Sequence, residues 1–148
     1  MSGILATNNR RRIATFLGAL AVTAATSVTA TTPANAATWL SDPGSCTNVQ
    51  TGTQRDVNGY TVQVRYGTCG GVQYGWGRVL NGPSDRYVVM EVDTNGDRRW
   101  DGKDERLIGT RNYTSGYATA SGSTRAFRAC VIKDPTWDCD AGSPTGWW

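Results

Sequence analysis

The chain of 148 residues carries 15 Lys and Arg, 12 Asp and Glu and no His, so its formal net charge is +3. Three of the fifteen basic residues are Arg10 to Arg12, which leaves twelve against twelve acidic residues in the rest of the chain. This balance argues against a nucleic-acid binder or an anionic-membrane binder, because such proteins carry clustered basic residues. The lack of His excludes Ser-His-Asp and Cys-His catalysis and zinc sites built on imidazole.

The first 36 residues have the pattern of a secretory signal peptide. Arg10 to Arg12 form a charged start, residues 13–30 carry no charge, and Ala34 and Ala36 form a small-residue cleavage motif before Ala37. A membrane anchor is the alternative, but Thr dilutes the apolar run and the cleavage motif follows it. We therefore expect a secreted, extracellular protein with no membrane insertion after cleavage. The arginines fit a twin-arginine signal loosely, and we favour the general export pathway.

Residues 37–148 have the length of one domain. Residues 37–45 lack strong secondary-structure signals, so we expect an extended N-terminal arm there and a single β domain over residues 46–148. Four cysteines in an exported chain predict two disulfides. Among the three pairings we favour Cys46–Cys69 and Cys130–Cys139, because each pair is adjacent in sequence and spans turn-rich residues. A metal cluster is the weaker alternative, since no two cysteines have CxxC spacing.

Alternation of apolar and polar residues predicts strands along this domain. Residues 60–66 read YTVQVRY, and Val72, Tyr74 and Trp76 continue the pattern, with Trp76 expected in the core. Further runs lie at residues 86–93, 107–108 and 124–132, separated by Asn-Gly, Asp-Gly and Ser-Gly turns. No window has a sustained helical period. We predict an all-β fold, a small antiparallel β-sandwich or barrel stapled by two disulfides.

One segment resembles a known family. Cys46, the stretch VNGYTVQVRYGTC at residues 57–69 and the stretch QYGWGR at residues 73–78 are similar to a family of small exported, disulfide-bonded actinobacterial proteins of unknown function. Its pattern is a Cys, a V-x-L-R-Y-S strand, a second Cys and W-x-R, and the match covers about residues 46–79. The resemblance implies a disulfide-bonded β-hairpin and an exported protein, and it transfers no catalytic residue.

Residues 93–105 read DTNGDRRWDGKDE, and their spacing of polar side chains is the pattern in this chain that most resembles a functional motif. Oxygen-bearing side chains stand at the ligand positions of a twelve-residue calcium loop, in a version that resembles dockerins: Asp93, Asn95, Asp97, Asp101 and Asp104. Against this interpretation, Arg98 stands where the sharp turn favours Gly, and neighbouring Arg and Lys residues already offset the carboxylates. A structural calcium site and a metal-free hairpin are the two alternatives.

All six tryptophans and all six tyrosines lie after residue 36. Trp39, Trp147 and Trp148 stand near the ends of the domain, where burial is least assured, and are candidate binding residues. Exposed aromatic rings stack on sugars or anchor a protein interface. The alternative is that these rings fold back to cover a sheet edge or to plug a barrel end.

The pattern does not favour an enzyme. A glycosidase needs two facing carboxylates, and most acids here are crowded into residues 93–105. No S-x-x-K spacing and no Gly-rich loop before a helix is present. We predict a secreted, non-catalytic interaction module that binds another exported protein as an adaptor or inhibitor. A carbohydrate or cell-wall binding module is the alternative: a row of exposed rings on one face would favour a glycan, and scattered apolar side chains would favour a protein.

Overall fold

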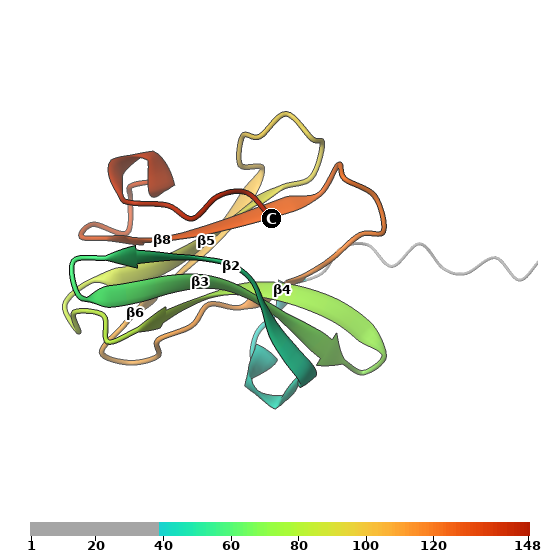
Figure 1. Ribbon diagram of the computed structural model, residues 1–148, viewed down its shortest axis with the longest axis horizontal. Coiled ribbons are helices and arrows are strands. Elements are labelled where there is room, and N and C mark those ends of the chain that lie inside the picture. The colour runs from blue at the N-terminus through green and yellow to red at the C-terminus, as the bar shows by residue number, and fades with distance from the viewer. Residues whose placement is uncertain (1–38) are drawn as a thin grey trace, which may run out of the picture. The chain divides into compact units, whose positions relative to one another are not determined.

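The computed structural model describes residues 39–148. The predicted signal peptide, residues 1–36, and the first two residues of the predicted arm lie outside the described residues. The described chain forms two antiparallel sheets and two short 3-10 turns, which confirms the all-β prediction (Figure 1). Within residues 39–148 no helix is long and apolar enough to cross a bilayer.

The larger sheet has five strands in the order β1-β7-β4-β3-β2. Its strands are β1 (Trp39–Leu40), β2 (Thr47–Val57), β3 (Tyr60–Cys69), β4 (Val72–Leu80) and β7 (Gly116–Ala118). The smaller sheet has the order β6-β5-β8. It consists of β5 (Tyr87–Asp93), β6 (Gly102–Leu107) and β8 (Ala126–Ile132). The 3-10 turns are η1 (Pro43–Ser45) and η2 (Cys139–Ala141).

Two-residue turns join the strands at the centre of the larger sheet. Asn58 and Gly59 connect β2 to β3 with positive φ angles of 45° and 91°. Gly70 and Gly71 connect β3 to β4 with φ angles of 58° and 83°. Two successive positive φ angles are characteristic of the type I′ turn, whose twist matches that of the flanking strands. The predicted Asn-Gly turn is therefore confirmed.

The core between the sheets is aliphatic, with one aromatic ring from β8. Val62, Val64 and Val79 of the larger sheet meet the smaller sheet. The smaller sheet contributes Val88, Met90, Val92, Phe127, Ala129 and Val131.

The faces of β4 are the reverse of what the apolar alternation suggests. A Cβ atom on Gly75 would lie 3.4 Å from the Phe127 ring, and one on Gly77 would lie 3.3 Å from Met90 and Ala129. The glycines therefore face the smaller sheet, because Phe127 and its neighbours occupy the space above them. Trp76 is buried, as expected, but it lies on the opposite, outer face of the larger sheet.

Both predicted disulfides are present. Cys46–Cys69 joins the start of β2 to the end of β3, with 4.6 Å between the Cα atoms. Cys130–Cys139 ties η2 to β8, with 5.5 Å between the Cα atoms. Val89, Ile132 and this second disulfide form a small apolar cluster.

Residues 39–45, where an extended arm is predicted, are folded onto the domain. Trp39 and Leu40 pair with Tyr117 and Gly116 as the edge strand β1. Asp42 caps η1 by accepting a hydrogen bond of 2.8 Å from the Gly44 backbone N–H. The first described residues therefore complete the larger sheet.

Candidate functional site

The three candidate tryptophans lie in different environments. Trp148 stacks on Tyr66 with 4.7 Å between ring centroids and lies 5.9 Å from Phe127. Its backbone exchanges two hydrogen bonds of 2.9 Å with Phe127 of β8. The ring packs so closely on β2 that a Cβ atom on Gly52 would lie 2.5 Å from it. Trp148 therefore closes the sandwich between β2 and β8, as the alternative of a covering or plugging ring expects.

Trp147 and Trp39 are partly accessible. The Arg128 guanidinium lies over the Trp147 ring, 4.8 Å from its centroid. Trp39 packs edge-on against Tyr117 at 4.9 Å and reaches within 3.5 Å of the Cβ position of Gly102 on β6. It remains 36% exposed. Trp39 thus bridges the two sheets on the side opposite Trp148.

Two further tryptophans, which the sequence did not single out as binding residues, are the most exposed aromatic rings of the described chain. Trp100 is 41% exposed and Trp137 is 45% exposed. Their position in turns, between polar residues, was the available signal. Together with Trp39 they form a group that we call the Trp surface.

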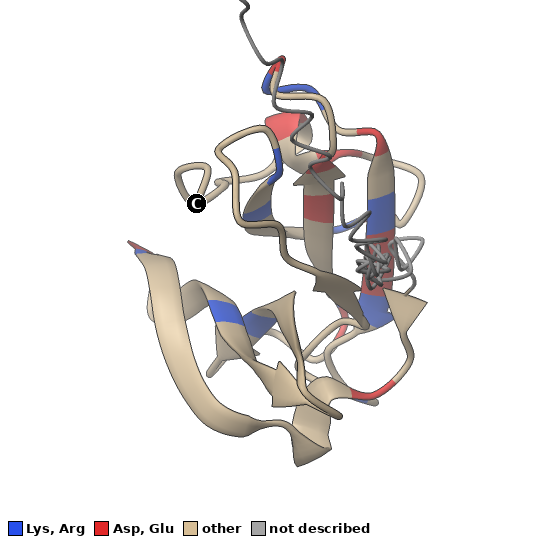
Figure 2. Cartoon of the chain, turned by 90° about the vertical axis from the view of Figure 1, so that its right-hand side faces the viewer, with Lys and Arg blue, Asp and Glu red and all other residues tan. Residues whose placement is uncertain are grey.

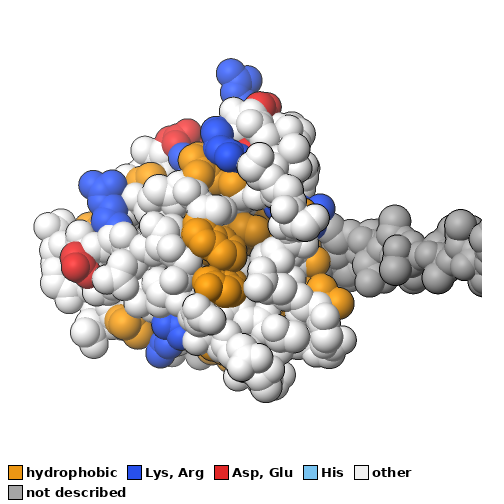
Figure 3. All heavy atoms as spheres, turned by 45° about the vertical axis from the view of Figure 1, so that its right-hand side comes forward, with side chains coloured by type: hydrophobic (Ala, Val, Ile, Leu, Met, Phe, Trp, Pro, Cys, Tyr) orange, Lys and Arg blue, Asp and Glu red, His pale blue; other side chains and the backbone are white. Residues whose placement is uncertain are grey.

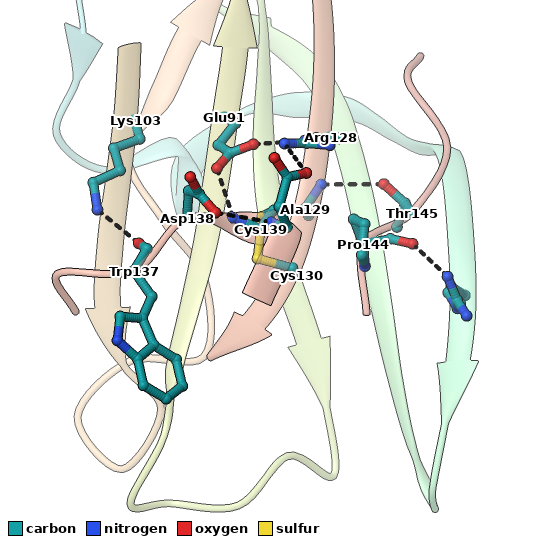
Figure 4. Close-up of a disulfide and its surroundings, with 12 residues drawn as sticks. Glu91, Lys103, Arg128, Ala129, Cys130, Trp137, Asp138, Cys139, Pro144 and Thr145 are labelled. Carbon is teal, nitrogen blue, oxygen red and sulfur yellow. Dashed lines mark hydrogen bonds and ion pairs between the residues drawn. A yellow bond between two sulfur atoms is a disulfide. The ribbon is translucent and has the colours of Figure 1, made fainter. Parts of the chain in front are cut away.

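The Trp surface extends along β6 from its start towards its end. Trp39 lies against Gly102, and Trp100 precedes that residue by two positions. The Lys103 ammonium donates a hydrogen bond of 3.0 Å to the Pro135 carbonyl. It donates another, of 2.9 Å, to the Trp137 carbonyl (Figure 4). Gly102 and Lys103 project to opposite faces of the strand. Trp39 and Trp100 therefore lie at the start of β6. Trp137 lies on the opposite face from Trp39, and its ring lines a cavity with Tyr87, which pairs with Leu107 at the end of the strand. β6 is an edge strand paired only with β5.

The candidate calcium loop is held by its own hydrogen bonds. Asp93 is fully buried and accepts backbone N–H bonds from Asn95, Gly96 and Arg98, at 3.0, 2.6 and 2.8 Å. The Arg98 guanidinium adds an ion pair at 2.9 Å. Burial opposes ionisation of Asp93, but the Gly96 and Arg98 donors outweigh it and lower its pKa. Arg98 adopts a φ of 62°, so the backbone accepts a non-Gly residue at this position of the loop.

Three of the five candidate ligands, Asp93, Asn95 and Asp101, are linked by hydrogen bonds, whereas the carboxylates of Asp97 and Asp104 bond elsewhere. The Asp101 carboxylate accepts from the Thr94 backbone N–H at 2.7 Å and from the side-chain amide of Asn95 at 3.3 Å. The side-chain oxygen of Asn95 accepts from the Asp97 backbone N–H. Asp104 lies on β6, where it accepts from the Ser115 N–H at 2.7 Å and pairs with Arg106. Over residues 39–148, no three His, Cys, Asp or Glu side chains are arranged to hold a metal.

The sequence leaves a calcium site and a metal-free hairpin as alternatives for this loop, and a thermal titration distinguishes them. We expect calcium at about 10 mM to leave the melting temperature unchanged, because a guanidinium already meets Asp93 and Asp104 points elsewhere. A site with the weakest extracellular affinity, about 1 mM, would instead gain about 1.4 kcal/mol under these conditions. A rise that disappears in Asp97→Ala, but not in the matched variant Asp134→Ala, would establish the calcium site.

A groove lies at the seam between the two sheets, beside Trp148. It has a volume of about 290 Å³ and an apolar floor of Phe127 and Trp148. Arg98, Arg125 and Gln73 stand at its rim, and one wall is formed by Thr119, Ala120, Gly122 and Ser123. Figure 3 views the molecule from this side and shows apolar side chains gathered near the centre of the face. The groove is large enough for one ring-sized group.

Glu91, the acid that stands before the loop, has a structural environment. It is fully buried, and its two oxygens accept from the Arg128 guanidinium and from the Cys139 backbone N–H (Figure 4). Arg128 also pairs with Asp140 at 2.9 Å. Burial opposes the charge of Arg128, but Glu91 and Asp140 outweigh that effect and raise its pKa. The carboxylate thus joins β5, β8 and η2.

Comparison with known proteins does not add to this site: no family model, curated protein or solved structure matches the chain. The resemblance of residues 46–79 to exported actinobacterial proteins therefore stays a prediction.

Proposed function

We propose that the protein is a secreted, non-catalytic interaction module that binds another exported protein through the Trp surface. The observation that carries the proposal is the exposure of Trp39, Trp100 and Trp137 around one edge strand. Tryptophan is the residue most enriched among interface hot spots, and grouped exposed apolar side chains mark interaction sites. Two disulfides and the signal-peptide pattern support export, since disulfides persist in oxidising compartments.

The arrangement of the rings favours a protein over a glycan. A glycan chain stacks on rings that share one flat face. Trp39 and Trp137 instead lie on opposite faces of β6, with Trp100 at its start. Such an arrangement suits a partner that wraps around the edge of the sheet. The charged stretch Lys103 to Arg106 on the same strand would supply the polar rim of the interface.

Substitution of the exposed rings tests this proposal. Pulldown from culture supernatant identifies the partner, and calorimetry with that partner measures the affinity of each variant. We expect Trp100→Ala and Trp137→Ala each to weaken binding about 30-fold, the loss that a hot-spot residue of about 2 kcal/mol produces. The melting temperature should change little, because both rings are exposed.

Val49→Ala is the matched control, because it removes an exposed apolar side chain from β2, an edge strand of the other sheet. Affinity that survives both Trp100→Ala and Trp137→Ala, or that falls equally in the control, would refute the proposed interface.

A cell-wall glycan is the second candidate ligand, and the seam groove favours it. Aromatic rings with a polar rim are the usual components of a sugar site, and Trp148, Arg125 and Gln73 supply them here. A glycan array run beside the pulldown separates the two candidates. Specific glycan binding that survives Trp100→Ala and Trp137→Ala would support the groove and reject the Trp surface.

A further inference from the structure

The outer face of the larger sheet, the layer that does not contain β6, carries a second cavity. Its volume is about 290 Å³, and it is lined by Pro43, Val49, Trp76, Arg78, Asn112 and Tyr113. Trp76 provides the floor, because it faces away from the smaller sheet and is only 4% exposed. The cavity therefore combines aromatic walls with a single cationic side chain, Arg78.

A second arginine stands beside this cavity on the same face. Strand register places Arg65 opposite Trp76 and Gln63 opposite Arg78, so all four side chains share the outer face. Arg65 donates to the Thr51 hydroxyl at 3.0 Å, while its Nε atom is buried without a partner. In the described part of the chain, neither Arg65 nor Arg78 has a carboxylate within 4.0 Å.

The acids nearest to the cavity are already balanced. Asp42 accepts from the Tyr113 hydroxyl at 3.0 Å, and Arg111, whose guanidinium lies 4.7 Å from the centre of the Tyr113 ring, offsets its charge. Asp56 accepts from Thr61 at 2.6 Å, in the row of the sheet beyond Gln63. Figure 2 shows that charged residues are concentrated on the smaller sheet and its loops rather than here. Two cations thus remain uncompensated.

The positive charges of Arg65 and Arg78 also repel each other. Burial, together with the positive charge of Arg78, lowers the pKa of Arg65. The Gln63 side chain between them is 6% exposed, and its oxygen has no hydrogen-bond partner. A bound anion would relieve the repulsion and supply the missing negative charge.

We infer that this cavity binds a carboxylate carried on an aromatic or apolar group. Arginine binds carboxylates with two parallel hydrogen bonds, which assigns the anion to Arg78, with Arg65 adding its charge from the neighbouring strand. Trp76, Tyr113 and Val49 would enclose the apolar part of the ligand. The volume lies at the lower end for ligand pockets, which fits one ring.

An NMR titration of the purified full chain tests the inference. N-acetylphenylalanine is the carboxylate probe, and N-acetylphenylalaninamide is the same molecule without the charge. We expect the acid to shift the resonances of Gly44, Trp76 and Tyr113 in a saturable manner and to bind about 10-fold more tightly than the amide. Equal binding of the two probes would overturn the inference. So would the absence of shifts at these residues with the acid at about 10 mM, a concentration that would largely saturate a site with a Kd of about 1 mM.

Variants then distinguish the contributions of Arg78 and Arg65 to binding. Arg78→Gln should abolish the preference for the acid, and Arg65→Gln should reduce the affinity about threefold, since it acts only through its charge. Arg86→Gln, an exposed arginine on a loop away from the cavity, is the matched control and should change neither value. Preference for the acid that persists in Arg78→Gln would reject the assignment. The comparison of the two probes on the unmodified protein decides the question even if a variant does not fold.

Discussion

Trp148→Ala is expected to destabilise the domain by about 3–5 kcal/mol, the range for removal of a large aromatic side chain from a packed site. The ring touches three elements at once: Tyr66 on β3, Gly52 on β2 and Phe127 on β8. Its loss would open the seam between the sheets to water. Urea denaturation followed by far-UV circular dichroism measures the change in the free energy of unfolding.

Two further variants make this test specific. Trp137→Ala, which removes the same side chain from an exposed position, should cost less than about 1 kcal/mol. Gly52→Ala should cost about 1–3 kcal/mol, because the added methyl group would overlap the Trp148 ring. If Trp148→Ala and Trp137→Ala had the same free energy of unfolding, the closing role of Trp148 would be wrong.

Glu91→Ala is expected to cost about 3–5 kcal/mol, because it leaves Arg128 in a largely buried site with one exposed partner, Asp140. It also removes the acceptor of the Cys139 backbone N–H. The double variant Glu91→Ala and Arg128→Ala should lose less than the sum of the two single variants, since the uncompensated charge is then gone. Differential scanning calorimetry on the three variants gives the coupling.

Glu105→Ala is the matched control for this cycle, because that carboxylate lies on the edge strand β6 and is not fully buried. It should change the free energy of unfolding by about 0.5 kcal/mol or less. A loss below about 1 kcal/mol for Glu91→Ala would mean that the ion pair contributes little beyond its own desolvation.

The sequence predicted the interior strands well, because their apolar residues recur with the period of a strand. Residues 60–66 lie within β3, and the runs 86–93 and 124–132 contain β5 and β8, which begin at Tyr87 and Ala126. Both disulfide pairings are confirmed. These features depend on local patterns: alternation, two-residue turns and the proximity of cysteines in the sequence.

The edge strands could not be predicted in the same way. β2 reads TNVQTGTQRDV and β6 reads GKDERL, and neither shows the alternation of a half-buried strand. Edge strands need no apolar face of their own and commonly carry charge, which discourages pairing with other chains. β1 and the segment ending at Trp148 are held by backbone pairing and by rings that dock on distant residues, and no local pattern encodes such contacts.

Trp76 is buried, as predicted, but the orientation of β4 could not be derived from the sequence, for a different reason. Alternation identifies which residues share a face, but it does not say which face is inside. A Cβ atom on Gly75 or Gly77 would already contact Phe127, Met90 or Ala129, so this face of β4 has no room for a large side chain, and the aromatic residues of β4 lie on the other face. The cavity at Trp76 and Arg78 exists because of this inversion, and the sequence alone could not have revealed it.

The two disulfides share a property that bears on how the chain acquires them. Cys46–Cys69 lies within the larger sheet, and Cys130–Cys139 joins β8 to the turn beside it, so neither bridge crosses from one layer to the other. Each cysteine is paired with its neighbour along the chain. A polypeptide that emerges from its N-terminus would present Cys46 and Cys69 to an oxidant long before Cys130 appears. Oxidation in order of appearance therefore yields the native connectivity directly, without an isomerase to reshuffle non-native pairs.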